Sequence, residues 1–201
     1  MEELGLEDMH EIAKDMRVWI DKLKGHTSYM SDVITAVKGQ AVNLSEEQAV
    51  DFTVTELFQH IKILMQHEIK HTLSTLNIKN NTSDSICIHG SINSLVQVIN
   101  NLISNSIQSY DKKTKEKVIN LIADYDSTDK HILIKVQDFG PGLPEHVRTK
   151  LFKEMVTTKG KDGTGLGLFM SYSNIKAHFK GDLTFETKTN KGTTFFIKIP
   201  V

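Results

Sequence analysis

Features of secreted and membrane proteins are scarce in this sequence of 201 residues. It has a single cysteine, Cys87, which excludes a disulfide bond within the chain. No apolar run approaches the roughly 20 residues that cross a membrane, and the acidic stretch from Met1 to Leu4 does not resemble the apolar part of a signal peptide. The formal net charge of −1 gives no electrostatic reason to expect a nucleic acid or a membrane surface as a partner. We therefore expect a cytoplasmic protein that contacts neither.

Helix-breaking residues are also scarce in the N-terminal third of the chain. Residues 1–75 contain no proline and only three glycines. Apolar residues recur at steps of three and four from Met9 to Ile34, which is typical of one stripe on a long helix. A second helix is predicted from Thr53, because Thr53 and Glu56 have the spacing of a capping box. We interpret residues 1–75 as a helical segment whose apolar stripes pack against a core or a partner helix.

The pattern changes after residue 76, where short alternating stretches predict strands. Cys87 lies between two isoleucines in such a stretch and is expected to be a small core residue. Residues 92–110 and 167–179 are predicted helices, and Gly181 is expected to end the second one. Residues 118–123 and 132–136 predict one pair of strands, and 183–187 and 194–199 predict a last hairpin. The sequence thus predicts an α+β domain over residues 76–201, a two-layer sandwich of a mixed sheet and helices.

Two asparagines on the first of these helices form a candidate metal site. Asn101 and Asn105 are four residues apart and therefore share one helix face. Neutral amide oxygens suit Mg²⁺, which usually keeps several waters and takes further ligands from phosphates. A solvated polar helix face would give the same pattern, so this pair alone does not decide between the two interpretations.

Three glycine-bearing segments follow the asparagines. Asp138 ends a predicted strand, and Gly140 and Gly142 let the backbone turn sharply and approach a ligand closely. Residues 163–168 open a helix with three glycines, which frees backbone N–H groups to face phosphate oxygens. The third segment is Gly192 and Thr193, at the start of the last strand. An ordinary turn would explain any one of them, but three glycines at a helix start are costly in entropy.

In this order the segments resemble the N, G1, G2 and G3 boxes of the GHKL superfamily, whose ATPase fold is shared by sensor histidine kinases, heat-shock chaperones, gyrase B subunits and MutL. Residues 151–159 are similar to the F box and the Thr-Thr-Lys sequence of histidine kinases of the nitrogen-regulator type. The resemblance implies a two-layer sandwich with helices on one face of the sheet. It also implies the catalytic domain of a two-component sensor histidine kinase, which transfers the γ-phosphoryl group of ATP to a histidine and then to an aspartate of a response regulator.

The resemblance further implies roles for individual residues. Asn105 would hold the Mg²⁺ of Mg-ATP, Asp138 would accept a hydrogen bond from the adenine amino group, and Asn101 and Asn105 would act in catalysis. The residues implied to bind ATP are Asn101, Asn105, Asp138, Gly140, Gly142, Phe152, Thr158, Lys159, Gly163, Thr164, Gly165, Leu166, Gly167, Leu168 and Thr193. The short polar segment 157–163 is expected to be a mobile lid, in which Lys159 and Lys161 are candidates to neutralise the terminal phosphates.

Two positions depart from patterns within the superfamily. Gln108 stands where many sensor kinases have a lysine, so a phosphate contact from it would be neutral. Asn101 stands where other superfamily members have a glutamate that activates water, and an amide cannot act as a general base at neutral pH. This favours transfer to an acceptor over hydrolysis. Two alternatives remain, a nucleotide-binding regulatory or scaffold module without phosphotransfer, and an ATP-driven clamp.

The phosphoacceptor histidine is not identified by the sequence. His10 and Glu11 superficially resemble the start of an acceptor box, but Asp15 stands where the family has a proline. In the family, a helix with the acceptor precedes a second helix and then the nucleotide domain. We expect residues 1–75 to be the distal part of that dimerisation hairpin, the acceptor helix to lie outside this chain, and the full-length protein to be a homodimer.

Overall fold

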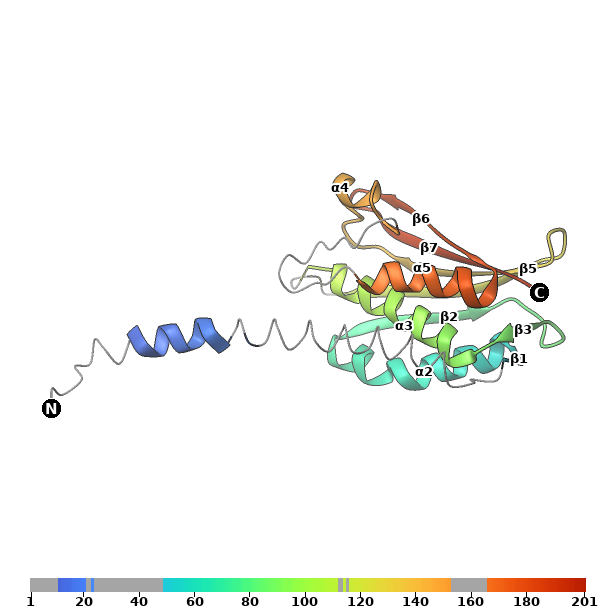
Figure 1. Ribbon diagram of the computed structural model, residues 1–201, viewed down its shortest axis with the longest axis horizontal. Coiled ribbons are helices and arrows are strands. Elements are labelled where there is room, and N and C mark those ends of the chain that lie inside the picture. Colours follow the sequence, from blue (N-terminus) through green and yellow to red (C-terminus); the bar gives the residue numbers. More distant parts are fainter. Residues whose placement is uncertain (1–10, 21–22, 24–48, 112–113, 115, 153–165) are drawn as a thin grey trace, which may run out of the picture.

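The computed structural model describes residues 11–20, 23, 49–111, 114, 116–152 and 166–201. Residues 11–20 are helical. The elements that follow are β1 (Val50–Thr53), α2 (Val54–His71), β2 (Ser74–Asn80), β3 (Cys87–Gly90), α3 (Ile92–Ser109), β4 (Lys117–Asp126), β5 (His131–Asp138), α4 (Glu145–Arg148), α5 (Leu166–Phe179), β6 (Asp182–Lys188) and β7 (Gly192–Pro200). Figure 1 shows α2, α3 and α5 lying together as one layer beside the strands of the main sheet.

The main sheet has five strands in the order β2-β4-β5-β7-β6. β2 and β4 are parallel, and the other neighbouring pairs are antiparallel. A parallel pair needs a crossover connection, and here α3 lies between β2 and β4 in the chain. β1 and β3 form a separate two-stranded antiparallel ribbon. The sheet is therefore mixed, as the sequence predicts.

One face of the main sheet is buried and the other is not. Ile119 and Leu121 on β4, and Ile132, Ile134 and Val136 on β5, are completely buried. Leu133 and Lys135, which alternate with these residues on β5, are partly exposed, as expected when alternate side chains point to opposite faces. Contacts of α2, α3 and α5 with the strands cover the buried face. The predicted two-layer sandwich with helices on one side is confirmed.

The start of α2 has the predicted capping box. The Thr53 hydroxyl accepts a hydrogen bond from the Glu56 backbone N–H at 3.2 Å, and Glu56 Oε2 accepts one from the Thr53 N–H at 2.8 Å. Leu57 and Ile61 of this helix are fully buried and belong to the same core as the sheet. The helix therefore packs against α3 and β2 as part of the sandwich.

Two local predictions need correction. Cys87 is exposed, so its prediction as a core residue is wrong. The period of two in β3 places Ile88 inside and Cys87 on the opposite face. α5 does end before Gly181, but Lys180 is the residue with a left-handed backbone, at φ +50°. The Gly181 N–H donates to the Ile175 carbonyl at 3.1 Å, and a Cβ at Gly181 would lie 2.4 Å from the Lys198 carbonyl oxygen. Close approach of β7 is thus the reason for glycine at this position.

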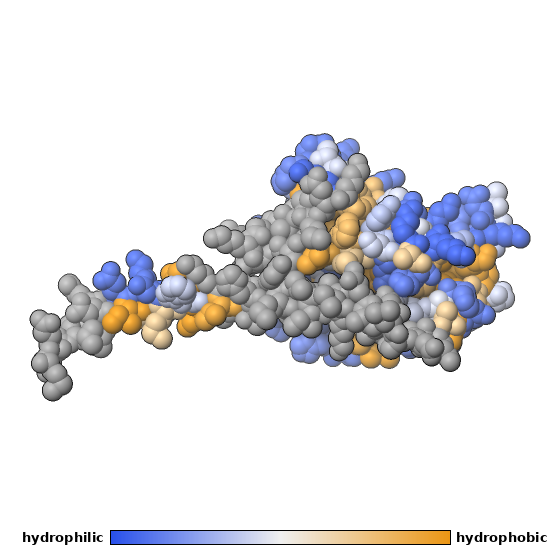
Figure 2. Space-filling model, in the orientation of Figure 1, coloured by the Kyte–Doolittle hydropathy of each residue, from blue (hydrophilic) through white to orange (hydrophobic). Residues whose placement is uncertain are grey.

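The helix of residues 11–20 exposes its apolar side chains. Figure 2 shows apolar side chains along one side of it, and Trp19 is 63% and Met16 58% exposed. The remainder of the stripe predicted to Ile34 lies largely outside the described residues. Among the helices described, none has the length and apolar character required to span a membrane.

Candidate functional site

The polar face of α3 meets the beginning of α5. The Asn101 Nδ2 donates to the Ser171 hydroxyl at 2.9 Å, and the Asn105 Nδ2 donates to the Asn101 Oδ1 at 3.2 Å. A Cβ on Gly167 would lie 2.7 Å from that same Oδ1. The glycine thus allows the first turn of α5 to approach Asn101 closely, and the two predicted asparagines are brought together with it.

Asp138 is a buried acceptor at the end of β5. The residue is only 3% exposed. The Oδ1 accepts from the backbone N–H groups of Gly140 at 2.9 Å and Thr193 at 3.2 Å, and the Oδ2 accepts from the Ser106 hydroxyl at 3.4 Å. Burial raises the pKa of the carboxyl, and these three hydrogen bonds oppose the rise only in part. Burial therefore makes the ionised form of the Asp138 carboxyl energetically unfavourable.

Three glycines lie near Asp138 at positions where a side chain would collide with neighbouring atoms. A Cβ at Gly192, which has φ +96°, would lie 2.0 Å from the Asp138 carbonyl oxygen. A Cβ at Gly142, with φ +78°, would lie 2.6 Å from the Lys188 carbonyl oxygen. At Gly140 it would meet the Ser109 hydroxyl at 2.7 Å. The absence of side chains at these glycines allows the loop after β5 to pack closely against the turn between β6 and β7.

Thr193 joins that turn to Asp138. Beside the bond from its N–H to Asp138, its hydroxyl lies 3.0 Å from the Thr187 hydroxyl. The Thr187 oxygen also accepts from the Leu143 N–H at 2.9 Å. Thr193 and Asp138 therefore form one hydrogen-bonded unit, although they are 55 residues apart in the chain.

Three residues of this region are not singled out by the sequence. Ser106 and Ser171 are buried hydroxyls that bond Asp138 and Asn101, as described above. Tyr110, at the end of α3, donates from its hydroxyl to the Val118 carbonyl at 2.6 Å and accepts from the Phe139 N–H at 2.8 Å. The position of Ser106 directly after Asn105 is the only signal that points to one of them.

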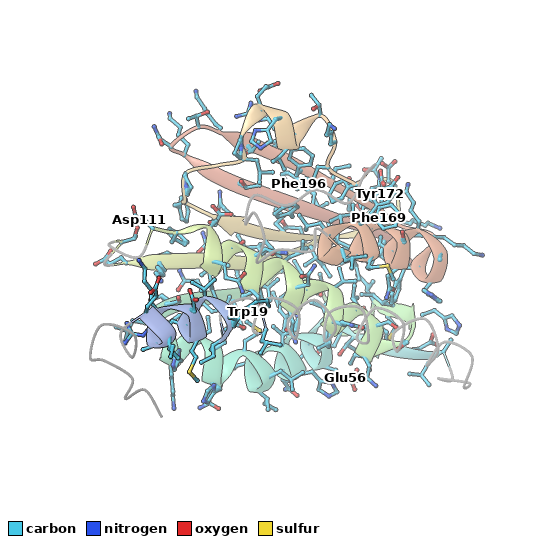
Figure 3. All side chains as sticks on the ribbon, turned by 60° about the vertical axis from the view of Figure 1, so that its left-hand side comes forward. Trp19, Glu56, Asp111, Phe169, Tyr172 and Phe196 are labelled. Atoms are coloured by element: carbon cyan, nitrogen blue, oxygen red, sulfur yellow. The ribbon has the colours of Figure 1, made fainter. Side chains whose placement is uncertain are left out.

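Phe152 lies in an aromatic cluster. Its ring stacks on Tyr172 of α5 at a centroid distance of 5.2 Å and meets Phe185 of β6 edge-on at 5.8 Å. Figure 3 shows Tyr172 on α5, the helix that also bears Ser171. The residue predicted to belong to an ATP-binding box thus packs the end of the described segment 116–152 against α5 and β6.

Five predicted site residues lie outside the described residues, together with Lys161 and the whole of the predicted lid, residues 157–163. They are Thr158, Lys159, Gly163, Thr164 and Gly165. Leu166, Gly167 and Leu168 are described and form the first turn of α5. The prediction of a mobile lid and of lysine contacts to phosphates stays a prediction.

The donor set suits a magnesium nucleotide. The Asn105 amide donates through Nδ2, so Oδ1 is the atom of this side chain that could ligate a cation, and neutral oxygens are suitable ligands for Mg²⁺. Because Gly167 has no side chain, the backbone at the start of α5 lies close to the Asn101 amide. α3 carries both asparagines and Ser106, so one helix connects the candidate metal ligands to Asp138.

Comparisons with known proteins agree with this arrangement. The family described as histidine kinase-, DNA gyrase B- and HSP90-like ATPase matches residues 90–201, more than half of the chain. Sporulation kinase A of Bacillus subtilis (strain 168) is 38% identical over 117 residues, which cover 58% of this chain and 18% of that protein. Sensor protein SrrB of Staphylococcus aureus (strain N315) is 28% identical over 195 residues, which cover 94% of this chain and 32% of that protein. The chain thus spans less than a third of the length of each of these relatives.

Solved structures show the same fold. Full-length ShkA in complex with AMPPNP superposes with a TM-score of 0.69 at 18% identity, over 99% of this chain and 40% of that one. The nucleotide-free catalytic domain of histidine kinase ThkA superposes with a TM-score of 0.65 at 24% identity, over 76% of this chain and 97% of that one. The two sequence relatives are thus a sporulation kinase and a sensor protein, and the ThkA structure is that of a histidine kinase catalytic domain. The chain belongs to the family of histidine kinase-, DNA gyrase B- and HSP90-like ATPases.

Proposed function

We propose that this chain binds Mg-ATP and transfers the γ-phosphoryl group to a histidine, for relay to an aspartate of a response regulator. The observation that carries the proposal is the buried acceptor Asp138, held at the end of β5 by two backbone N–H groups and a hydroxyl. A buried carboxylate can accept from the exocyclic amino group of adenine, whereas guanine presents a carbonyl at that position. The AMPPNP bound to ShkA supports a nucleotide site in this fold.

The asparagines are proposed to act at the phosphate end. Asn105 and Asn101 would hold Mg²⁺ and orient the phosphates, and the metal supplies positive charge there when bound. Phosphoryl transfer depends mainly on positioning and charge neutralisation. Asn101 is an amide bonded to Ser171 and offers no base for activating water. Transfer to an acceptor that brings its own nucleophile therefore fits this site better than hydrolysis.

The rest of the assembly is also proposed. We assign the catalytic unit to residues 76–201 and the distal part of a dimerisation hairpin to residues 1–75, with α2 as the junction that packs on both α3 and β2. The exposed apolar side chains of residues 11–20 support a homodimer of the full-length protein. ThkA in complex with the response regulator protein TrrA supports a response regulator as partner.

The magnesium dependence of binding tests the proposal. Asn105→Ala should weaken ATP binding in magnesium far more than in EDTA, because the lost oxygen is a ligand of the metal. Calorimetry on the whole chain measures both affinities, and Asn77→Ala, an exposed amide on β2, is the matched control. An equal loss in magnesium and in EDTA would contradict the assignment of Asn105.

A labelling experiment tests the missing acceptor. Incubation of the chain with γ-labelled ATP should give no acid-labile, base-stable phosphoprotein. In-line transfer needs an imidazole placed to within about 1 Å, and we expect the helix that carries this imidazole to lie outside the chain. Label that His10→Gln removes would instead identify His10 as the acceptor and would contradict our interpretation of residues 1–75.

A further inference from the structure

The turn between β4 and β5 gathers two carboxylates and an imidazole. Asp126 and His131 face each other as the last cross-strand pair, and Asp129 lies in the turn between them. One ligand atom from each of these three residues lies within 4.8 Å of the others. Figure 1 shows this turn near the C-terminal end of the chain, where the Val201 N–H donates to the Lys130 carbonyl at 3.0 Å.

His131 supplies the observation that points to a ligand. The residue is only 7% exposed, and its Nδ1 has no hydrogen-bond partner among the residues that the structure describes. The nearest carboxylate oxygen, Asp129 Oδ2, is 4.0 Å away, which is too long for a hydrogen bond. A buried nitrogen without a partner is unfavourable. This nitrogen faces the two carboxylates, so a bound cation would satisfy it.

We propose that Asp126, Asp129 and His131 bind a divalent transition-metal ion of the zinc type. An imidazole nitrogen favours Zn²⁺ and its neighbours over Mg²⁺, which prefers an all-oxygen set. Asp126 Oδ1 accepts from the Thr128 N–H at 2.8 Å, and the carboxylate has further lone pairs that can ligate a metal. Ligands about 2.0–2.2 Å from a zinc ion lie roughly 3–3.5 Å apart. Small side-chain rotations of the two exposed aspartates would shorten the distances between the ligand atoms from the present 4.8 Å or less to this range.

One neighbouring charge opposes the metal. The Lys198 Nζ lies 3.3 Å from Asp129 Oδ2, and this ammonium would repel a divalent ion at the same carboxylate. We therefore expect that replacement of Lys198 by a neutral residue strengthens binding of the metal ion. The site is also separate from the nucleotide, because Asp138 is at the other end of β5, seven residues or about 24 Å along the strand.

The experiment is a titration of the whole chain with Zn²⁺ by calorimetry and with Co²⁺ by visible absorption. His67 and His71 are exposed, one helical turn apart on α2, with ring centroids 6.2 Å from each other, and could chelate the same ions. The titration is therefore done in a His67→Gln, His71→Gln background. Binding should remain there, with Zn²⁺ preferred over Mg²⁺. Loss of all binding in this background would overturn the proposal.

Variants of the site complete the test. His131→Gln and Asp129→Asn should each weaken the affinity by about tenfold or more, and Lys198→Gln should strengthen it several-fold. Asp129 is 61% exposed in its side chain, so its variant tests the site even if the buried His131 variant folds poorly. His89→Gln, an exposed histidine beside Asp51, is the matched control. Unchanged affinity in Asp129→Asn, or weaker binding in Lys198→Gln, would contradict the site. ATP affinity should be the same in all of these variants.

Discussion

Asp138→Asn should weaken nucleotide binding and stabilise the nucleotide-free protein at the same time. The substitution keeps the shape of the side chain. Its Oδ1 can still accept from the N–H groups of Gly140 and Thr193, and its Nδ2 can donate to the Ser106 hydroxyl. What changes is the charge and the atom presented to adenine, where a donor now meets a donor.

The two effects have opposite signs for separate reasons. Hydrogen bonds to charged groups contribute about 1.5–3 kcal/mol, so ATP affinity should fall roughly 10- to 150-fold. Stability moves the other way, because burial raises the pKa of Asp138 in the folded protein. A group with a raised folded pKa contributes its stabilisation fully below its unfolded pKa of about 3.9 and loses it as pH rises through the folded pKa. At pH values above this raised pKa the carboxylate is ionised at a free-energy cost that asparagine does not have.

Calorimetry with Mg-ATP and thermal unfolding of the nucleotide-free chain from acid to neutral pH measure both quantities. The melting temperature of Asp138→Asn should exceed that of the wild type at pH values above the raised pKa of Asp138, and the difference should shrink as the pH falls below that pKa. Asp84→Asn, an exposed carboxylate that accepts from Thr55, is the control for the change in net charge. Unchanged ATP affinity with a clear loss of stability would refute the role of Asp138.

Three further substitutions separate packing from binding. Gly192→Ala should destabilise the protein by at least about 2 kcal/mol in chemical denaturation, because a left-handed backbone costs about 1–2 kcal/mol and the Cβ meets the Asp138 carbonyl oxygen. Gly167→Ala meets only the flexible end of Asn101, so it should weaken Mg-ATP binding with little loss of stability; equal destabilisation by both glycine variants would contradict this. Tyr110→Phe should cost about 1–3 kcal/mol because it orphans the backbone N–H group that its hydroxyl accepts. A denaturation midpoint like that of the wild type would show that water replaces the hydroxyl.

Much of the fold could be predicted because local signals and burial agree. The capping box at Thr53 marks the start of α2, and alternating apolar residues mark β5, since one face of that strand is completely buried. Cys87 shows the limit of such patterns. Between two isoleucines it looks like a core residue, but a strand buries every second side chain and Ile88 takes the inward position.

The structure brings predicted site residues together where the sequence signal is a glycine or helix periodicity, and their roles stay predictions. Asn101 and Asn105 share a helix face for geometric reasons, and Gly192 lies close to Asp138 because it has no side chain to collide with the Asp138 backbone. The hydroxyls of Tyr110 and Ser171 could not be predicted. Their partners are contributed by other elements, 70 residues away in the case of Ser171, and no local pattern encodes such a contact.

The nucleotide preference of the wild-type chain tests the proposed adenine site at Asp138 most directly. Calorimetric titrations with ATP and GTP in saturating magnesium compare the two bases at one site. We expect ATP to bind, and GTP to bind at least about tenfold more weakly, the equivalent of one lost hydrogen bond, because guanine places a carbonyl oxygen against the buried carboxylate of Asp138. Equal affinity for the two nucleotides, or no binding of ATP, would contradict this expectation.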